Sequence, residues 1–353
     1  MSTRLICLFF LFQLFGFSQN QFTFSGSIYE SEGQETLIGA NVIFPELNTG
    51  AITNEYGFYS ITLPKGTYKL TISYLGYNTV TEIVILDQNL TQNYSLSTTA
   101  DALDEIVLET DVERINIKTP QMSVNALNAN TIKQIPVVFG EADVVKAITL
   151  LPGVSNGGEG TGGFNVRGGS NDQNLILLDE ATLFNSSHLF GFFSVFNPDA
   201  IKNLKLYKGG IPAKYGGRVA SVLDIYQKEG NKNEFHGNGG IGLVASRILL
   251  EGPLEKEKGS FLLGGRSTYA HLFLPLFDIE NIAYFYDLNT KLSYRLDADN
   301  KIYLSGYFGR DVFNVSNSFE NTYGNTVVNF RWNHLFSEQL FSNLSLIDRK
   351  SVV

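Results

Sequence analysis

The 353-residue sequence has a single cysteine, Cys7, and it lies inside an apolar N-terminal run. Once that run is set aside the chain has no thiol, which excludes a disulfide framework, a cysteine-ligated metal and a thiol nucleophile. Basic residues are also scarce, since 26 Lys and Arg stand against 35 Asp and Glu, for a net charge of −9. No nucleic-acid partner is expected, because phosphate binding needs clustered Lys and Arg.

Long apolar stretches are missing after the N-terminal run, so the sequence predicts no transmembrane helix there. The chain has instead 34 Gly, 27 Phe and 17 Tyr, a composition that favours strands and turns. If the protein enters a membrane it must do so as a closed barrel, because only helices and barrels satisfy every backbone group in lipid.

The N-terminus has the three parts of a secretory signal peptide. Arg4 supplies the charge, residues 5–17 form the apolar core, and Ser18 offers a small residue before polar Gln19. We predict a signal peptide over residues 1–18. The alternative is a retained membrane anchor, although a span needs about 20 apolar residues.

Residues 21–97 contain short apolar runs separated by turns that are rich in Gly and Pro. Tyr68, Leu70 and Ile72 alternate with polar neighbours, as a half-buried strand requires. The pattern predicts a small β-sandwich. No His-Glu pair at zinc spacing occurs in it, so we expect a noncatalytic spacer.

A linker is predicted over residues 98–115, and it contains the strand-competent run Leu103–Glu109. An extended segment of this kind can add as a strand to the sheet edge of a partner, with backbone hydrogen bonds giving affinity. The alternative is a plain linking strand.

Residues 116–228 combine helix and strand patterns and predict an α+β domain. A helix is predicted over 141–151, where apolar residues share one face, and strands over 175–178, 201–207 and 220–226. The glycine-rich stretch 157–163 resembles a phosphate loop, but no Lys-Ser or Lys-Thr and no helix follows it. A flexible loop is the better interpretation.

From residue 234 to 353 the chain alternates apolar and polar residues over long runs. Tyr286, Leu288 and Leu292 share one face of a predicted strand, while Asp287 and Lys291 share the other. Short connections at 297–300 and 336–339 alternate with long ones at 271–283 and 315–325. Six or seven antiparallel strands with an apolar outside and a charged inside are typical of a transmembrane barrel, although a soluble sandwich would use the same alternation.

Several motifs in order resemble the plug domain of TonB-dependent outer-membrane receptors. They are Leu151-Pro152-Gly153-Val154, Asn165-Val166-Arg167-Gly168-Gly169, Leu178-Asp179, Lys208-Gly209 and Tyr215-Gly216-Gly217-Arg218. The first domain, with Gly39-Ala40-Asn41-Val42, Gly57-Phe58-Tyr59 and Tyr74-Leu75-Gly76-Tyr77, resembles the carboxypeptidase-regulatory-like domain that precedes many such receptors of Bacteroidetes type. One departure is Asp179-Glu180, where the family usually has Asp-Gly, and we expect a less tight turn there.

The resemblance implies three sets of functional residues. The candidate TonB box is Asp104, Glu105, Ile106, Val107 and Leu108. Arg167 and Arg218 would pair with carboxylates on the barrel wall, the alternative being surface salt bridges of little worth. His188 would contact a ligand on an exposed plug loop, the alternative being that it packs with Phe190 and Phe192.

The resemblance also implies a mainly β fold, with a sandwich at 21–97, a plug at 116–228 and the N-terminal part of a barrel at 234–353. The protein would lie in the outer membrane with its first domain in the periplasm. Its partners would be a TonB-type energy-transducing complex, an extracellular ligand, membrane lipid and a surface lipoprotein. No cofactor, metal or enzyme activity is implied, since no catalytic triad or metal set has the required spacing.

The function expected from this resemblance is import of a ligand, with ligand sensing without transport as the alternative. A siderophore, glycan, peptide or vitamin all remain open. Because receptors of this family close with about 22 strands, six or seven cannot enclose a plug. We therefore expect the sequence to be a fragment that does not function alone.

Overall fold

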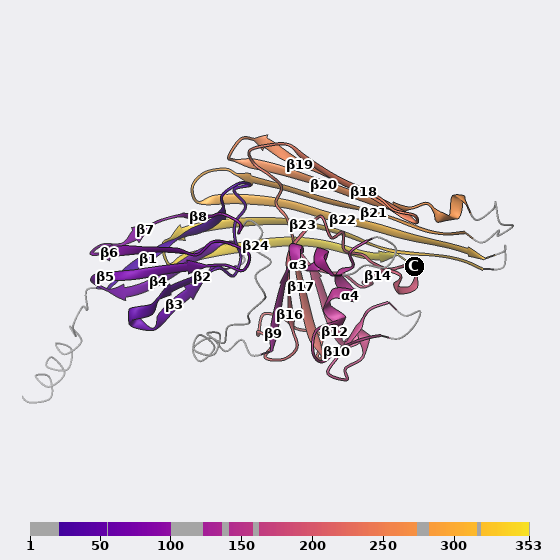
Figure 1. Cartoon of the computed structure of the whole chain (residues 1–353), viewed down its shortest axis with the longest axis horizontal. Coiled ribbons are helices and arrows are strands. Elements are labelled where there is room, and N and C mark those ends of the chain that lie inside the picture. Colours follow the sequence, from indigo (N-terminus) through magenta and orange to yellow (C-terminus); the bar gives the residue numbers. More distant parts are fainter. Residues whose placement is uncertain are drawn as a thin grey trace, which may run out of the picture. The chain divides into compact units, whose positions relative to one another are not determined.

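The computed structural model describes residues 21–54, 56–99, 123–135, 141–157, 162–273, 282–315 and 319–352. These residues form two compact units, an N-terminal β domain and a larger body (Figure 1). The predicted signal peptide 1–18 and the candidate TonB box 104–108 lie outside the described residues.

The N-terminal domain is a sandwich of two four-stranded sheets. One sheet has the order β4-β1-β7, with β8 also paired to β1, and the other has the order β3-β2-β5-β6. Phe24, Phe44 and Tyr59 pack between them with less than 2% of their surface exposed. The strands are β1 (Gln21–Glu30), β2 (Asn41–Phe44), β3 (Thr49–Ile52), β4 (Phe58–Pro64), β5 (Gly66–Ser73), β6 (Val80–Leu86), β7 (Leu90–Thr91) and β8 (Tyr94–Leu96), with the 3-10 helix η1 (Pro45–Leu47).

The second unit contains an α+β domain built on the five-stranded sheet β13-β12-β17-β16-β9. Its strands are β9 (Val124–Asn128), β10 (Val154–Asn156), β11 (Phe164–Val166), β12 (Asn174–Leu178), β13 (Ala181–Thr182), β14 (Ser187–His188), β15 (Phe193–Ser194), β16 (Ile201–Tyr207) and β17 (Ser221–Gln227). Its helices are α3 (Ala129–Gln134), α4 (Val144–Thr149), η2 (Asn171–Gln173) and η3 (Leu189–Gly191). Within the described residues, no helix is long and apolar enough to cross a membrane. We call the described part of residues 123–228 the plug.

Helix α4 is shorter than the predicted helix 141–151. Asp143 has an extended backbone, and its side chain accepts a hydrogen bond from the Lys146 amide, so the helix begins at Val144. A side chain that satisfies a free amide in the first turn is what starts a helix. Val144 and Ile148 are fully buried in the main core of the plug, which explains the apolar stripe in the sequence.

The expectation of a loose turn at Asp179-Glu180 is wrong. Leu178 pairs directly with Ala181, so only two residues connect β12 to β13. Both adopt positive φ, +47° at Asp179 and +73° at Glu180, as in the tightest hairpin turns. Glu180 therefore holds a left-handed conformation without the freedom of a glycine, which costs about 1–2 kcal/mol.

The chain after the plug forms one antiparallel sheet of seven strands in sequence order, here called the wall (Figure 1). This agrees with the predicted six or seven strands. They are β18 (His236–Ile241), β19 (Ala245–Glu255), β20 (Gly259–Thr268), β21 (Ile282–Arg295), β22 (Asn300–Val315), β23 (Phe319–Ser337) and β24 (Leu340–Val352), and η4 (Ala270–Leu272) follows β20.

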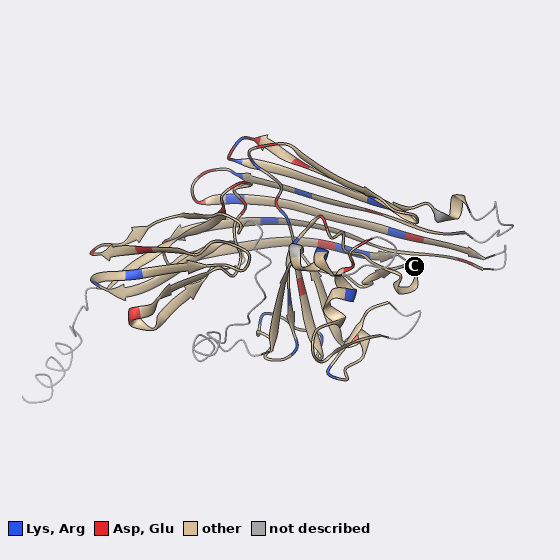
Figure 2. Cartoon of the chain, viewed as in Figure 1, with Lys and Arg blue, Asp and Glu red and all other residues tan. Residues whose placement is uncertain are grey.

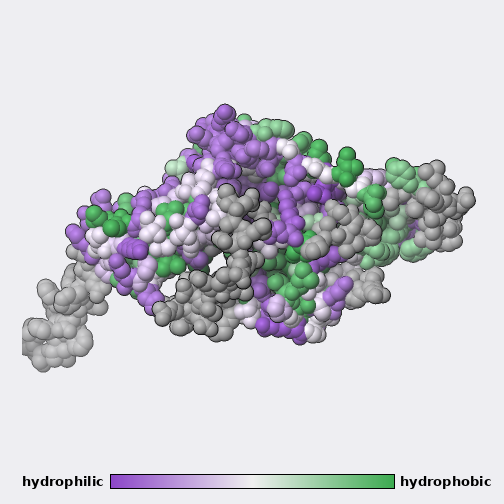
Figure 3. All heavy atoms as spheres, viewed as in Figure 1, coloured by the Kyte–Doolittle hydropathy of each residue, from purple (hydrophilic) through white to green (hydrophobic). Residues whose placement is uncertain are grey.

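Burial on the wall is inverted relative to a water-soluble sheet. On β21, Asp287, Asn289 and Lys291 are at most 4% exposed, whereas Leu288 and Leu292 are 43% and 40% exposed. Charged residues lie along the long strands (Figure 2), and apolar atoms cover parts of the outer surface over the same sheet (Figure 3). The polar face of the wall is therefore the one that is covered.

One predicted long connection is wrong. The segment 315–325 is mostly strand, because β22 continues to Val315 and β23 begins at Phe319, with Val315 paired to Phe319. Asn321, Thr322 and Tyr323 are polar enough to resemble a loop, yet each has a backbone partner on β22. Pairing with a long neighbouring strand overrides a weak local preference.

Candidate functional site

The interface between plug and wall contains many buried charged side chains. Side chains from five wall strands, β19 to β23, reach plug residues there. The pairs are Arg247 with Asp199, Arg266 with Glu141, Lys291 with Asp179, Arg331 with Glu180, and Asp287 and Asp311 with His188. Buried charges need partners of this kind to offset their lost hydration.

Arg266 on β20 is 4% exposed and joins several of these groups. It lies directly opposite Asp287 in the β20–β21 register, and its Nε is 3.0 Å from Asp287 Oδ2. Its Nη1 donates to Glu141 at 2.7 Å, and its Nη2 donates to the Ser194 carbonyl at 2.9 Å. The planar guanidinium thus joins a wall carboxylate, a plug carboxylate and the plug backbone.

His188 at the end of β14 is 1% exposed. Its Nδ1 is 2.7 Å from Asp311 Oδ2, and its Nε2 is 3.2 Å from Asp287 Oδ2. The ring stacks on Phe285 with centroids 4.1 Å apart. Burial by itself would lower the pKa of His188, but the hydrogen bonds and charges of Asp287 and Asp311 outweigh it and raise the pKa above its usual value.

The β12–β13 turn is also fastened to the wall. Lys291 Nζ donates to Asp179 Oδ1 at 3.1 Å, and Asn329 Nδ2 donates to the Asp179 carbonyl at 2.5 Å. Glu180 Oε1 lies 3.7 Å from Arg331 Nη1. The strained turn thereby presents two carboxylates to β21 and β23.

Asp199 joins plug and wall through two cations. Lys133 Nζ on α3 is 2.6 Å from its Oδ1, and Arg247 Nε on β19 is 2.7 Å from its Oδ2. Burial would raise the pKa of Asp199, but the bonds from Lys133 and Arg247 outweigh it and lower the pKa. The carboxylate is therefore held in its charged form.

Inside the plug, the Tyr215-Gly216-Gly217-Arg218 motif is anchored by its tyrosine. The Tyr215 hydroxyl donates to Asp224 Oδ2 at 2.7 Å, and the Tyr226 hydroxyl donates to the same atom at 2.7 Å. Burial raises the pKa of Asp224 despite these two bonds. Tyr215 thus ties a glycine-rich loop to the central strand β17.

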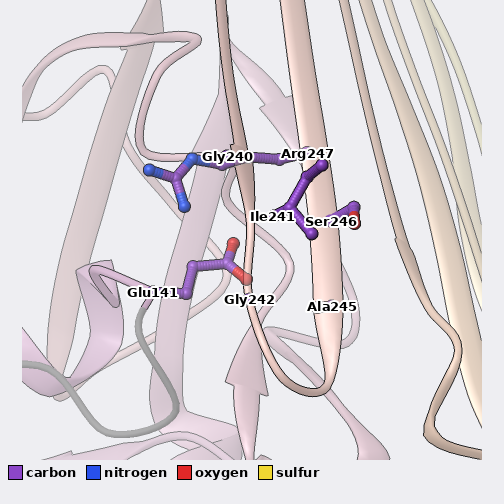
Figure 4. A pocket seen from close by; sticks show the side chains of 7 residues that line it. All are labelled: Glu141, Gly240, Ile241, Gly242, Ala245, Ser246 and Arg247. Carbon is purple, nitrogen blue, oxygen red and sulfur yellow. The ribbon is translucent and has the colours of Figure 1, made fainter.

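A small pocket of about 100 Å³ lies beside Glu141, under the turn between β18 and β19. Glu141 and Arg247 enter it from different elements, next to Gly240, Ile241 and Ser246 (Figure 4). Ligand sites for small molecules have about 300–1,000 Å³, so this pocket is the size of a few waters.

The structure describes three of the functional residues that were predicted from the sequence. His188 is buried under the wall, as described above. Arg167 has positive φ, +49°, and its Nη2 donates to Ser123 Oγ of the plug at 2.8 Å. Arg218 Nη1 donates to the Gly217 carbonyl at 3.0 Å. Pairing of these two arginines with wall carboxylates stays a prediction, as does ligand contact by His188.

Sequence reasoning did not single out Arg266, Asp311 or Glu141. A signal was available, because inward positions on a strand alternate and a charge at such a position has to find a buried partner. Asp287 and Lys291 were placed on the covered face in this way. Their plug partners are separated from them by 99 and 112 residues, a distance over which sequence alone gives no pairing.

A plug held by polar contacts against the covered face of a long-stranded sheet, whose other face is apolar, is the arrangement expected of an outer-membrane receptor. Residues 24–108 match the CarboxypepD_reg-like domain family, and residues 115–222 match the TonB-dependent receptor plug domain family. In the part of the chain that the structure describes, no group of three or more His, Cys, Asp or Glu is arranged to hold a metal.

Relatives agree with this assignment. The chain is 27% identical over 229 residues to the TonB-dependent receptor SusC of Bacteroides thetaiotaomicron, covering 60% of this chain and 21% of SusC. The fold resembles the siderophore receptor PirA of Acinetobacter baumannii, with a TM-score of 0.50, 18% identity, and 66% of this chain and 40% of PirA covered. PirA of Pseudomonas aeruginosa matches with a TM-score of 0.50 at 20% identity, over 65% of this chain and 40% of PirA.

The chain therefore carries a carboxypeptidase-regulatory-like domain followed by a TonB-dependent receptor plug domain, and it is similar to a TonB-dependent receptor of Bacteroides. It spans about a fifth of the length of the curated relative and about two fifths of the solved receptors. The matched proteins are receptors rather than enzymes.

Proposed function

We propose that this protein imports an extracellular ligand across the outer membrane by energised rearrangement of its plug, without covalent chemistry. The observation that carries the proposal is the polar character of the plug–wall interface. Hydrogen bonds and ion pairs join the plug to the wall at Arg266, Lys291 and His188. Such contacts can be exchanged for water, so the plug can yield without exposing a large apolar surface.

In this proposal, ligand binding outside the cell shifts the plug and releases the candidate TonB box toward the periplasm. An energy-transducing complex of the TonB type then binds residues 104–108 by strand addition and pulls. The same proposal places the N-terminal domain in the periplasm, keeps the domain boundaries predicted from the sequence, and includes contact with a surface lipoprotein. The ligand class stays open among siderophores, glycans, peptides and vitamins.

Uptake by cells that carry the full-length gene tests import. We expect replacement of residues 104–108 by a Gly-Ser segment of equal length to abolish uptake while surface binding of the same ligand is kept. Candidate ligands are supplied one class at a time as the sole source of iron, carbon or cobalamin. Replacement of residues 111–115 in the same way is the matched control.

A second function, ligand sensing without transport, predicts a different result. Binding would then change expression of a reporter, and uptake would be absent in the unaltered protein. Uptake that persists after residues 104–108 are replaced would contradict the import mechanism proposed here.

A further inference from the structure

The segment from His188 to Phe190 is held in an unfavourable backbone conformation by the wall. Leu189 and Phe190 follow His188 with φ of +49° and +55°, the left-handed region that non-glycine residues rarely occupy. The Leu189 amide donates to Asp311 Oδ1 at 2.8 Å, and the Phe190 amide donates to the Tyr323 hydroxyl at 3.3 Å. Strain of this kind persists only where surrounding contacts impose it.

Asp311 on β22 holds both the ring and the backbone of this segment. Its Oδ2 is 2.7 Å from His188 Nδ1, while its Oδ1 accepts from the Leu189 amide. On the other side of the ring, Nε2 is 3.2 Å from Asp287 Oδ2 on β21. Carboxylates on two wall strands therefore contact the imidazole from opposite edges of the ring.

The two ring nitrogens both face carboxylate oxygens, and this geometry distinguishes the protonation states. A neutral imidazole has one N–H donor and one acceptor, whereas the imidazolium donates from both nitrogens. Only the imidazolium can donate to Asp311 and Asp287 together. In the neutral ring, one lone pair would point at a carboxylate.

The charges around the ring favour the same state. Asp287 on β21, Asp311 on β22 and Glu141 ahead of α4 are anionic, and Arg266 on β20 is the cation that bridges Asp287 and Glu141. All four side chains are at most 7% exposed. A protonated His188 brings this buried group to two positive against three negative charges, whereas a neutral ring leaves one against three.

We propose that His188 is a proton-dependent latch: its imidazolium fastens the plug segment 188–190 to the wall carboxylates Asp287 and Asp311, and loss of the proton loosens that segment. Tyr307 supplies the alternative arrangement. Its hydroxyl is 3.2 Å from His188 Nε2, so it donates to that nitrogen when the proton has left. Asp287 then stays paired with Arg266 and no longer accepts from the ring, so a neutral bond to Tyr307 replaces a charged bond to Asp287. Asp311 and Tyr323 still bind the backbone amides of Leu189 and Phe190.

The sign of the pH dependence follows from the raised pKa of His188, for which the bonds to the two aspartates outweigh the opposing effect of burial. The latch is fully closed below the pKa of a free imidazole, about 6.5, and is lost as the pH rises through the pKa of the latched ring. Between these two values, opening of the segment increases about tenfold per pH unit.

Nuclear magnetic resonance of the full-length protein with 15N-labelled histidine, in detergent micelles, tests the protonation state. The His188 resonances are identified by their loss in the His188→Gln variant. We expect both ring nitrogens to carry protons at about pH 6.5, with a titration midpoint above that of a free imidazole. Asp311→Asn removes one of the two carboxylates and should move the midpoint to lower pH. A neutral ring, or an unchanged midpoint in Asp311→Asn, would overturn the proposal.

Hydrogen exchange over residues 186–195, corrected for the intrinsic pH dependence of exchange, tests the latch itself. We expect protection in the unaltered protein to fall relative to strand β12 (Asn174–Leu178) as pH rises, whereas His188→Gln should show no such pH dependence. Equal pH dependence in both proteins contradicts the latch. Both readouts are structural, so they stand whether import or sensing is the function.

Discussion

At the scale of single residues, the larger unit is organised by charges that are buried and paired across long sequence separations. Arg266 satisfies Asp287, Glu141 and the Ser194 carbonyl. Removing one member of such a group leaves the others buried and unpaired, which costs more than the pair contributes. The side chains on the covered face of the wall thus decide where the plug binds.

Arg266→Met is the sharpest test at this scale. We expect it to lower the free energy of unfolding by about 3–5 kcal/mol, because Asp287 and Glu141 lose their cation in a buried site. Denaturant unfolding of the full-length protein in micelles, followed by tryptophan fluorescence, measures the change. Lys258→Met is the control, since its pair with Glu255 is exposed, and it should change little. Equal effects of the two substitutions would contradict the role of burial.

At the scale of elements, one side chain connects helix α4 to strand β15 through hydrogen bonds. Asp143 accepts from the Lys146 amide at 2.9 Å through Oδ1 and from the Ser194 amide at 2.8 Å through Oδ2. One carboxylate therefore caps α4 and fixes β15, whose carbonyl at Ser194 in turn accepts from Arg266. The position of a short helix is transmitted in this way to the wall contact.

Substitutions at Asp143 should show a graded effect. Asp143→Ala removes both bonds, and the loss of the helix cap alone costs about 1 kcal/mol. Asp143→Asn keeps an acceptor for the Lys146 amide but loses the second carboxylate oxygen, so it should fall between Ala and the unaltered protein. Hydrogen exchange of the Lys146 and Ser194 amides separates the two bonds. Faster exchange at Lys146 in Asp143→Asn than in Asp143→Ala would contradict this reading of the cap.

At the scale of the whole molecule, the sandwich and the wall have surfaces suited to different surroundings. The sandwich buries its apolar residues between two sheets, whereas the wall turns leucines and aromatics outward and covers its charges. A sheet of this kind is stable only where its outer face contacts lipid. The inverted burial of β21 is thus the molecular basis of the outer-membrane assignment.

Charged substitutions on exposed apolar residues distinguish these surfaces. Leu292→Arg on the outer face of β21 should destabilise the full-length protein in lipid vesicles by about 2–4 kcal/mol if it lies near the midplane. Ile83→Arg on the sandwich, where Ile83 is 73% exposed, should stay within about 0.5 kcal/mol. Reversible unfolding in vesicles measures both. A neutral Leu292→Arg would show that this face meets water.

Much of the fold was predictable because local patterns report local structure. The strand at Ile201–Tyr207 was predicted with the bounds that the structure has, and the two faces of β21 were assigned correctly from alternation alone. The errors came where neighbours override local preference. Residues 315–325 form strand because β22 and β23 pair with each other, and the turn at Glu180 is tight because Leu178 pairs with Ala181.

The sequence by itself indicated the class of protein and the order of its parts, through motifs that resemble a known family. It also indicated the inward side of β21, β22 and β23, since periodicity depends only on near neighbours. Only the tertiary structure decided which charges meet. The residues around His188 in the sequence do not indicate its partners, because the two aspartates lie 99 and 123 residues away. Burial makes these pairings strong because water no longer screens them, and burial is a property of the folded chain alone.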